Sequence, residues 1–224
     1  MQKLEAGIHH FQANYFATHR QLFEQLAENG QRPETLFITC SDSRVIPELI
    51  TNAAPGELFI VRNVGNIVPS VKRGVLGGVS AAIEFAVQVL EVGNVIVCGH
   101  TGCGAMGAIL EPARVANLPL VRRWLAESES IPRLIEERYG ALTGEERVTA
   151  AVEENVLLQL ENLRSFDFVQ QRLDEGKLKM SGWVFKIATG DVFDYDPIAG
   201  QFLKLAGEDR QALSSRPPPA LTER

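Results

Sequence analysis

The 224-residue sequence contains only three cysteines, no excess of basic residues and no long apolar segment. An odd number of cysteines does not build a disulfide framework, so we expect reduced thiols and a cytoplasmic chain. Because 28 Asp and Glu stand against 22 Lys and Arg, the basic surface of a general nucleic-acid binder is missing. Every apolar stretch is interrupted well before the ~18 residues of a membrane span. Glu5, His9 and His10 also make the N-terminus unlike a secretory signal.

Hydrophobic residues make up 45% of the chain and charged residues 22%, which is typical of a globular protein. An apolar stripe at helical spacing fills the first 30 residues, and Gly30 caps its end. Helical segments then alternate with short apolar runs, which predicts an α/β fold: a mainly parallel central β-sheet flanked by helices, with an N-terminal helical arm and a late antiparallel hairpin. The expected strands are 35–39, 58–61 and 95–98, the expected helices are 77–91, 119–126, 145–163 and a short one from Gly104, and the hairpin joins 182–187 to 191–195.

Side chains that commonly bind zinc follow two of the predicted strands. Cys40 comes directly after the first strand, whereas His100 and Cys103 follow the third. The carboxyl ends of parallel strands share one edge of the sheet, so we expect these three side chains to meet. Two thiolates and one imidazole suit tetrahedral Zn²⁺ with one position free, as in catalytic zinc sites. Cys98 lies inside the third strand and is expected to be a core residue.

The cysteines and the histidine belong to longer motifs. Residues 40–44 read Cys-Ser-Asp-Ser-Arg and residues 100–103 read His-Thr-Gly-Cys, with Pro-Gly-Glu at 55–57 and Arg-Asn at 62–63 between them. This set resembles the β-class carbonic anhydrases of the bacterial and cyanobacterial kind. The resemblance extends over nearly the whole chain and stops before the Pro-rich C-terminal segment.

The resemblance implies a complete catalytic centre. Cys40, His100 and Cys103 would bind one Zn²⁺ per subunit, and Asp42 and Arg44 would form a catalytic dyad. The implied reaction is the reversible hydration of CO₂ to bicarbonate and a proton, by attack of a zinc-bound hydroxide that the dyad orients. Paired hydrogen bonds from Arg44 would keep Asp42 ionised and able to accept the proton of the hydroxide.

Asp42 could instead bind the zinc itself, as it does reversibly in some members of the family. In those members bicarbonate occupies a regulatory pocket built with a Trp before the first ligand and a Tyr in the late hairpin. The aligned positions here are Phe37 and Phe185, and Thr39 stands where a Gly would be. Because both hydrogen-bond donors are lost, we predict that Asp42 stays paired with Arg44 and that bicarbonate does not inhibit.

The resemblance also implies the positions that bind substrate. Gln31 matches a family position whose amide hydrogen-bonds substrate, often across the subunit interface. Phe59, Val64 and Phe85 resemble the apolar wall of a pocket that suits CO₂, which has little demand for hydrogen bonds. Gly104 is predicted to belong to the same substrate-binding set.

The chain is predicted to comprise three parts. Residues 1–30 form an arm that makes a homodimer or a higher oligomer, and residues 31–207 form the zinc-binding catalytic domain. Residues 208–224 are Pro-rich and polar, which predicts disorder. This tail is a candidate tether for a carboxysomal or other protein partner, and the carboxysome is then the alternative location.

Other interpretations use the same residues. The Gly-x-Gly-x-x-Gly pattern at 102–107 is typical of dinucleotide sites, but no acidic residue follows at the expected place. A cysteine phosphatase needs Cys-x₅-Arg to cradle a phosphate, and Arg44 follows Cys40 too closely. A structural zinc would need a fourth ligand, which only Asp42 could supply. Hydrolysis of carbonyl sulfide or carbon disulfide would use the same centre, and the sequence leaves that alternative open.

Overall fold

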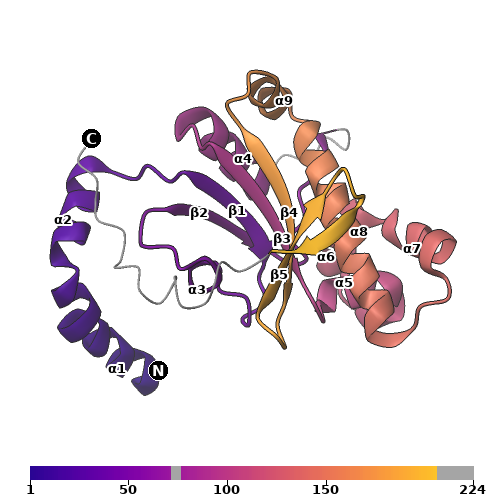
Figure 1. Cartoon of the computed structure of the whole chain (residues 1–224). Helices are drawn as coiled ribbons and strands as arrows, with labels where there is room; N and C mark the ends of the chain where they lie inside the picture. Colours follow the sequence, from indigo (N-terminus) through magenta and orange to yellow (C-terminus); the bar gives the residue numbers. More distant parts are fainter. Residues whose placement is uncertain (72–76, 206–224) are drawn as a thin grey trace.

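The computed structural model describes residues 1–71 and 77–205 of the chain. They form a six-stranded sheet in the order β2-β1-β3-β4-β5-β6 (Figure 1). The pairs β2–β1, β1–β3 and β3–β4 are parallel, and the pairs β4–β5 and β5–β6 are antiparallel. This confirms the predicted mainly parallel sheet and its late hairpin. The strands are β1 (Thr35–Cys40), β2 (Leu58–Asn63), β3 (Asn94–His100), β4 (Lys179–Lys186), β5 (Asp191–Asp196) and β6 (Gln201–Lys204).

Helix α8 (Gly144–Arg164) packs directly on β3 and β4, and Figure 1 shows it beside these strands. The close approach depends on two glycines, because a Cβ on Gly99 would lie 2.7 Å from Val152 Cγ1 and one on Gly182 would lie 2.8 Å from Val156 Cγ1. Among the described residues the body also contains the helices α3 (Pro47–Thr51), α4 (Gly78–Glu84), η3 (Phe85–Val89), α5 (Gly104–Leu110), η4 (Pro112–Val115), α6 (Pro119–Leu125), η5 (Ala126–Ser128), α7 (Ile131–Tyr139) and α9 (Asp167–Asp174). In the described ranges, none of the helices is both long and apolar enough to cross a membrane.

The N-terminal arm consists of α1 (Gln2–Phe11), the π-helical turn η1 (Gln12–Phe16) and α2 (Arg20–Asn29). Gly30, with φ of 72°, follows the last helical residue as expected. Figure 1 shows the arm beside the body rather than within it. Within the described part of the chain, none of the residues in these three segments is buried. The first half of the apolar stripe is exposed in a single chain, at Leu4, Ile8, Phe11 and Tyr15, whereas Leu22, Phe23 and Leu26 are partly buried.

The structure adds elements that the sequence patterns did not predict, among them α3, α7, α9 and β6. Several strand boundaries also differ: Cys40 and His100 are the last residues of β1 and β3 rather than the residues that follow them, β2 continues to Asn63, and β4 begins at Lys179. The extension of β3 has a clear cause, since His100 pairs with Phe185 of β4. The predicted tail, residues 208–224, lies outside the described residues.

Candidate metal centre

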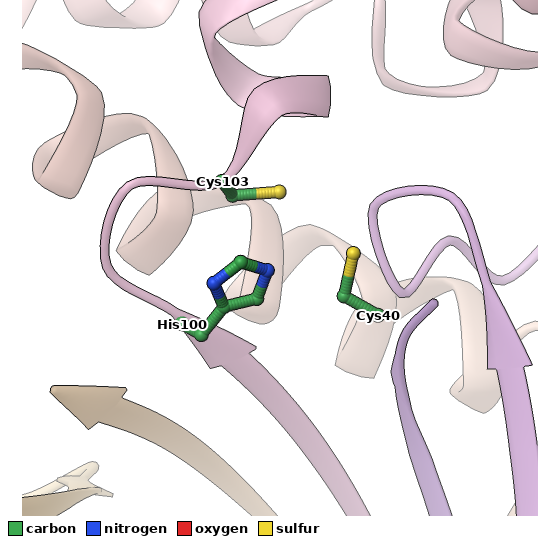
Figure 2. A group of neighbouring side chains, drawn as sticks. All are labelled: Cys40, His100 and Cys103. Atoms are coloured by element: carbon green, nitrogen blue, oxygen red, sulfur yellow. The ribbon is translucent and has the colours of Figure 1, made fainter. Parts of the chain in front are cut away.

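Cys40, His100 and Cys103 meet at the carboxyl edge of the sheet. Cys40 ends β1 and His100 ends β3, the strand that pairs with β1 in parallel, while Cys103 directly precedes α5. One potential ligand atom from each side chain lies within 4.8 Å of the others. Figure 2 shows both sulfur atoms and the imidazole ring turned toward a common space. All three residues are buried, so the site lies within the fold rather than on its surface.

The imidazole of His100 is oriented with one nitrogen free for a ligand. Its Nδ1 lies 3.0 Å from the carbonyl oxygen of Thr101, an atom that only accepts hydrogen bonds, so Nδ1 carries a proton. The other nitrogen, Nε2, is buried and has no hydrogen-bond partner among the described residues. A buried polar atom without a partner is costly, and a metal ion would satisfy this one.

Thr101 is itself held by β4, which fixes the carbonyl that orients His100. The Thr101 amide donates to the carbonyl of Phe185 at 3.0 Å, and the Thr101 hydroxyl oxygen accepts from the amide of Ile187 at 3.2 Å. This backing of a histidine ligand by a hydrogen-bonded carbonyl is common in protein metal sites. β4 therefore belongs to the architecture of the site although it supplies none of the three candidate ligands.

The two thiols of the site form a coupled pair. The pKa of Cys40 is lowered to about 4, chiefly by the neighbouring Cys103 thiol, with smaller contributions from His100 and from the amides of Gly65 and Asp42, although burial opposes the shift. The pKa of Cys103 is raised, since its thiol donates to Cys40 and is buried beside that thiolate. A divalent cation bound here would displace the remaining thiol proton and pair with two thiolates.

Cys98 provides the contrast. It is fully buried inside β3, and burial raises the pKa of its thiol to about 12. Its sulfur lies 3.4 Å from the carbonyl oxygen of Gly99, so the thiol donates a hydrogen bond to the backbone. Cys98 is a core residue, as the sequence predicted.

Asp42 and Arg44 form a bidentate pair beside the three candidate ligands. Arg44 Nε donates to Asp42 Oδ1 at 2.9 Å, Arg44 Nη2 donates to Oδ2 at 2.7 Å, and the Arg44 amide donates to Oδ1 at 3.0 Å. These hydrogen bonds hold the pKa of Asp42 far below its ordinary value. Asp42 Oδ2 lies 3.8 Å from His100 Nε2, so the ionised carboxylate faces the space between the ligands.

Arg62 fixes the backbone that carries this pair. Its Nε donates to the carbonyl of Cys40 at 3.1 Å, and its Nη2 donates to the carbonyl of Asp42 at 2.7 Å. The guanidinium group therefore connects β2 to the first motif and is already engaged by two carbonyl groups. The sequence motif contained Arg62 but gave no indication of this role.

An open cavity of about 370 Å³ lies beside Cys40, Ser41 and Asp42. Val64 and Gly104, two of the predicted substrate-binding residues, line it. The other three lie elsewhere among the described residues: the rings of Phe59 and Phe85 pack against each other with centroids 6.1 Å apart, and Gln31 is exposed after α2. Sequence reasoning missed most of the apolar wall of the cavity, because no sequence pattern shows that the segment 104–125 folds back over the site. The wall residues from this segment are Ala105, Ala108, Val115, Val121 and Leu125.

Comparisons with known proteins identify the class to which this site belongs. A protein-family model described as carbonic anhydrase matches residues 35–192. The chain is 45% identical over 204 residues to the carbonic anhydrase of Synechocystis, covering 91% of this chain and 74% of that protein. It is 44% identical over 206 residues to the carbonic anhydrase of Pseudomonas aeruginosa, covering 92% of both. The chain belongs to the carbonic anhydrase family.

Solved structures specify the class within that family. The β-carbonic anhydrase CcaA superposes with a TM-score of 0.88 at 44% identity, covering 92% of this chain and 99% of that chain. The Coccomyxa β-carbonic anhydrase, solved in complex with acetazolamide, superposes with a TM-score of 0.74 at 30% identity, covering 85% and 83%. The chain is a β-class carbonic anhydrase.

Proposed function

We propose that this carbonic anhydrase hydrates CO₂ reversibly with one Zn²⁺ per chain, held by Cys40, His100 and Cys103. The observation that carries the proposal is the cluster of three buried donor atoms within 4.8 Å, one of them a histidine nitrogen with no hydrogen-bond partner in the described part of the chain. Two sulfurs and one nitrogen match the donor preference of zinc and leave a fourth position open. A bound zinc supplies the Lewis acidity that makes hydroxide available from water near neutral pH.

Asp42 is proposed to act as the hydrogen-bond acceptor that orients the nucleophile. Arg44 holds the carboxylate in one orientation and keeps it ionised, and Oδ2, which accepts a single hydrogen bond, retains a lone pair for a further donor. Because both oxygens already bond Arg44, Asp42 is poorly placed to bind the metal itself. The open position is thus left for water, and the apolar cavity wall beside it suits CO₂.

The remaining substrate-binding residues are proposed to act in a dimer. Gln31, Phe59 and Phe85 do not line the cavity of one chain, but a second chain could bring them to it. The apolar side chains of Leu4, Ile8, Phe11 and Tyr15 in the arm are exposed, as expected of a surface that another subunit covers. The solved β-carbonic anhydrases of Sordaria macrospora, 28% identical with a TM-score of 0.77, are tetrameric.

The free thiols fit a reducing compartment such as the cytoplasm, and the tail remains a candidate tether there or in the carboxysome.

Metal analysis combined with a stopped-flow CO₂ hydration assay tests the proposal. The purified protein is expected to hold one Zn²⁺ per chain, to lose activity when a chelator removes it, and to regain activity when zinc is restored. A chain that holds zinc but shows no hydration at any pH would support a structural metal instead. Carbonyl sulfide and carbon disulfide, assayed in parallel, show whether the same centre prefers the sulfur analogues.

A further inference from the structure

The segment after β2 reaches the metal centre with an unusual backbone. Val64 lines the cavity, and the amide of Gly65 contributes to the lowered pKa of Cys40. Gly65 and Asn66 both have positive φ, 84° and 49°, and a Cβ on Gly65 would lie 3.0 Å from the Cβ of Ala105. Left-handed backbone costs free energy at a residue other than glycine. Contacts from elsewhere in the fold must therefore hold this segment against the site.

Polar side chains on one face of α8 supply these contacts. Asn155 Nδ2 donates to the carbonyl of Gly65 at 3.1 Å, and Gln159 Oε1 accepts from the amide of Val68 at 2.8 Å. Asn162 Nδ2 donates to the carbonyl of Val68 at 2.9 Å. All three side chains are buried, so their hydrogen bonds do not compete with bulk water. The segment is thus held at two points, one next to the site and one farther along the chain.

The orientation of the Asn155 carboxamide is set by residues other than Gly65. Ser128 Oγ donates to Asn155 Oδ1 at 2.9 Å, and Gln159 Nε2 donates to the same oxygen at 2.8 Å. Because Oδ1 accepts both hydrogen bonds, the Nδ2 group is the one that faces Gly65, and it can only donate. Ser128 is itself fully buried. The hydrogen bonds therefore run in one direction, from Ser128 and Gln159 to Asn155 and from Asn155 to the Gly65 carbonyl.

We propose that Asn155 is a positioning residue for the metal centre: it holds the Gly65 peptide so that the Gly65 N–H donates to Cys40 Sγ and Val64 stays in the cavity wall. This inference rests on the proposed zinc site. Groups that orient a metal ligand from outside typically change metal affinity or activity about 10- to 100-fold when they are removed. Loss of a donor to the thiolate also leaves more charge on the sulfur, which changes the electronic spectrum of a bound transition metal.

Asn155→Ala and Asn162→Ala form a matched pair for the test. Both remove a buried carboxamide from the same face of α8, but only Asn155 bonds Gly65. In competition with a chromogenic chelator, Asn155→Ala is expected to bind zinc about 10- to 100-fold more weakly than the wild type, whereas Asn162→Ala keeps wild-type affinity. In the cobalt-substituted proteins, the thiolate-to-cobalt charge-transfer band is expected to move to longer wavelength in Asn155→Ala alone. Equal affinities and spectra in the two variants would overturn the proposal.

A measurement on the wild-type protein decides the question if Asn155→Ala does not fold. In the full chain loaded with the NMR-active isotope of cadmium, the Gly65 amide proton is expected to show scalar coupling to the metal through Cys40 Sγ. The Asn155 carboxamide protons are expected to exchange slowly with water. Absent coupling, or fast exchange, overturns the proposal. A wild-type chain that binds neither zinc nor cadmium would instead refute the proposed zinc site, so the two failures are distinguishable.

Discussion

The N-terminal arm and the carboxyl edge of the sheet differ in how much of their structure one chain completes. At the sheet edge, Cys40, His100 and Cys103 are at most 6% exposed and are surrounded by hydrogen bonds from the same chain. In the arm, Leu4 is 67% exposed and Ile8 is 56% exposed. The metal centre can therefore be assembled by one chain, whereas the apolar surface of the arm calls for a second one. The contrast predicts that metal binding and assembly can be perturbed separately.

Replacing a ligand at the sheet edge should have the largest effect. Cys40→Ala is expected to lose zinc and to reduce CO₂ hydration by roughly a thousandfold or more, since the metal contributes several kcal/mol of transition-state stabilisation. Cys98→Ala is the matched control, because it removes an equally buried thiol that does not face the site. It should keep one zinc per chain and cost only about 1 kcal/mol of stability. Equal zinc content in the two variants would contradict the ligand assignment.

Replacing the proposed acceptor should leave the metal in place. Asp42→Asn is expected to retain zinc and to lower kcat/KM by about 10²- to 10⁴-fold, the range for loss of a positioned proton acceptor. Asp191→Asn serves as the control, because Asp191 forms a comparable ion pair with Lys204 at 2.7 Å on β5, away from the site. Stopped-flow hydration and metal analysis measure both effects. Wild-type activity in Asp42→Asn would refute the dyad.

Removing the arginine of the pair should change how Asp42 titrates. The folded-state pKa of Asp42 is depressed mainly by the hydrogen bonds from Arg44, so the stabilisation is present above the ordinary pKa of 3.8 and is lost as pH falls through the depressed value. In Arg44→Gln the pKa is expected to rise toward 3.8. Carboxyl-carbon NMR of the zinc-loaded protein can follow this titration. An unchanged titration of Asp42 would show that Arg44 does not hold it ionised.

Changing the arm should affect assembly while leaving the single chain almost unchanged. A Leu4→Glu and Ile8→Glu double variant is expected to be monomeric in light scattering, with zinc retained. Because both side chains are exposed, the unfolding free energy of one chain should change by only about 0.5 kcal/mol. Ala6→Glu adds charge to the opposite helical face and should leave the oligomer intact. A double variant that elutes and scatters like the wild type would show that the arm does not mediate assembly.

The smallest effect is expected from bicarbonate. Phe37 is fully buried with its ring against Trp183, and the Thr39 hydroxyl donates to the Cys98 carbonyl at 2.9 Å. Arg62 is engaged by two backbone carbonyls. With these groups occupied, the region behind Cys40 offers a bicarbonate ion few free hydrogen-bond donors. Inhibition at mildly acidic pH should therefore be less than about twofold, as expected for an anion that binds only weakly at the protein surface. Strong inhibition by bicarbonate, measured against chloride at equal ionic strength, would contradict this prediction.

The sequence predicted the strands and the meeting of Cys40, His100 and Cys103 well because both follow from local patterns. Short β-rich runs mark β1, β2 and β3, and the parallel arrangement then brings Cys40 and His100 to one edge. The helix α3 has only five residues, too few for an apolar period to be recognised. In α8 the apolar stripe was visible, but Asn155 and Gln159 are buried as well. Their partners, Gly65 and Val68, lie about 90 positions away in sequence, a distance that no local pattern encodes.

The parallel pairing of β1 with β3 also constrains when the metal can enter the protein. Cys40 and His100 belong to strands joined by a long crossover, and parallel strands of this kind form late because loop closure opposes them. β4, which backs His100, comes from a part of the chain made still later during synthesis. A nascent chain therefore carries Cys40, His100 and Cys103 long before it carries the strand that orients His100. Under the proposed zinc binding, the fully held site forms only once β4 has joined the sheet.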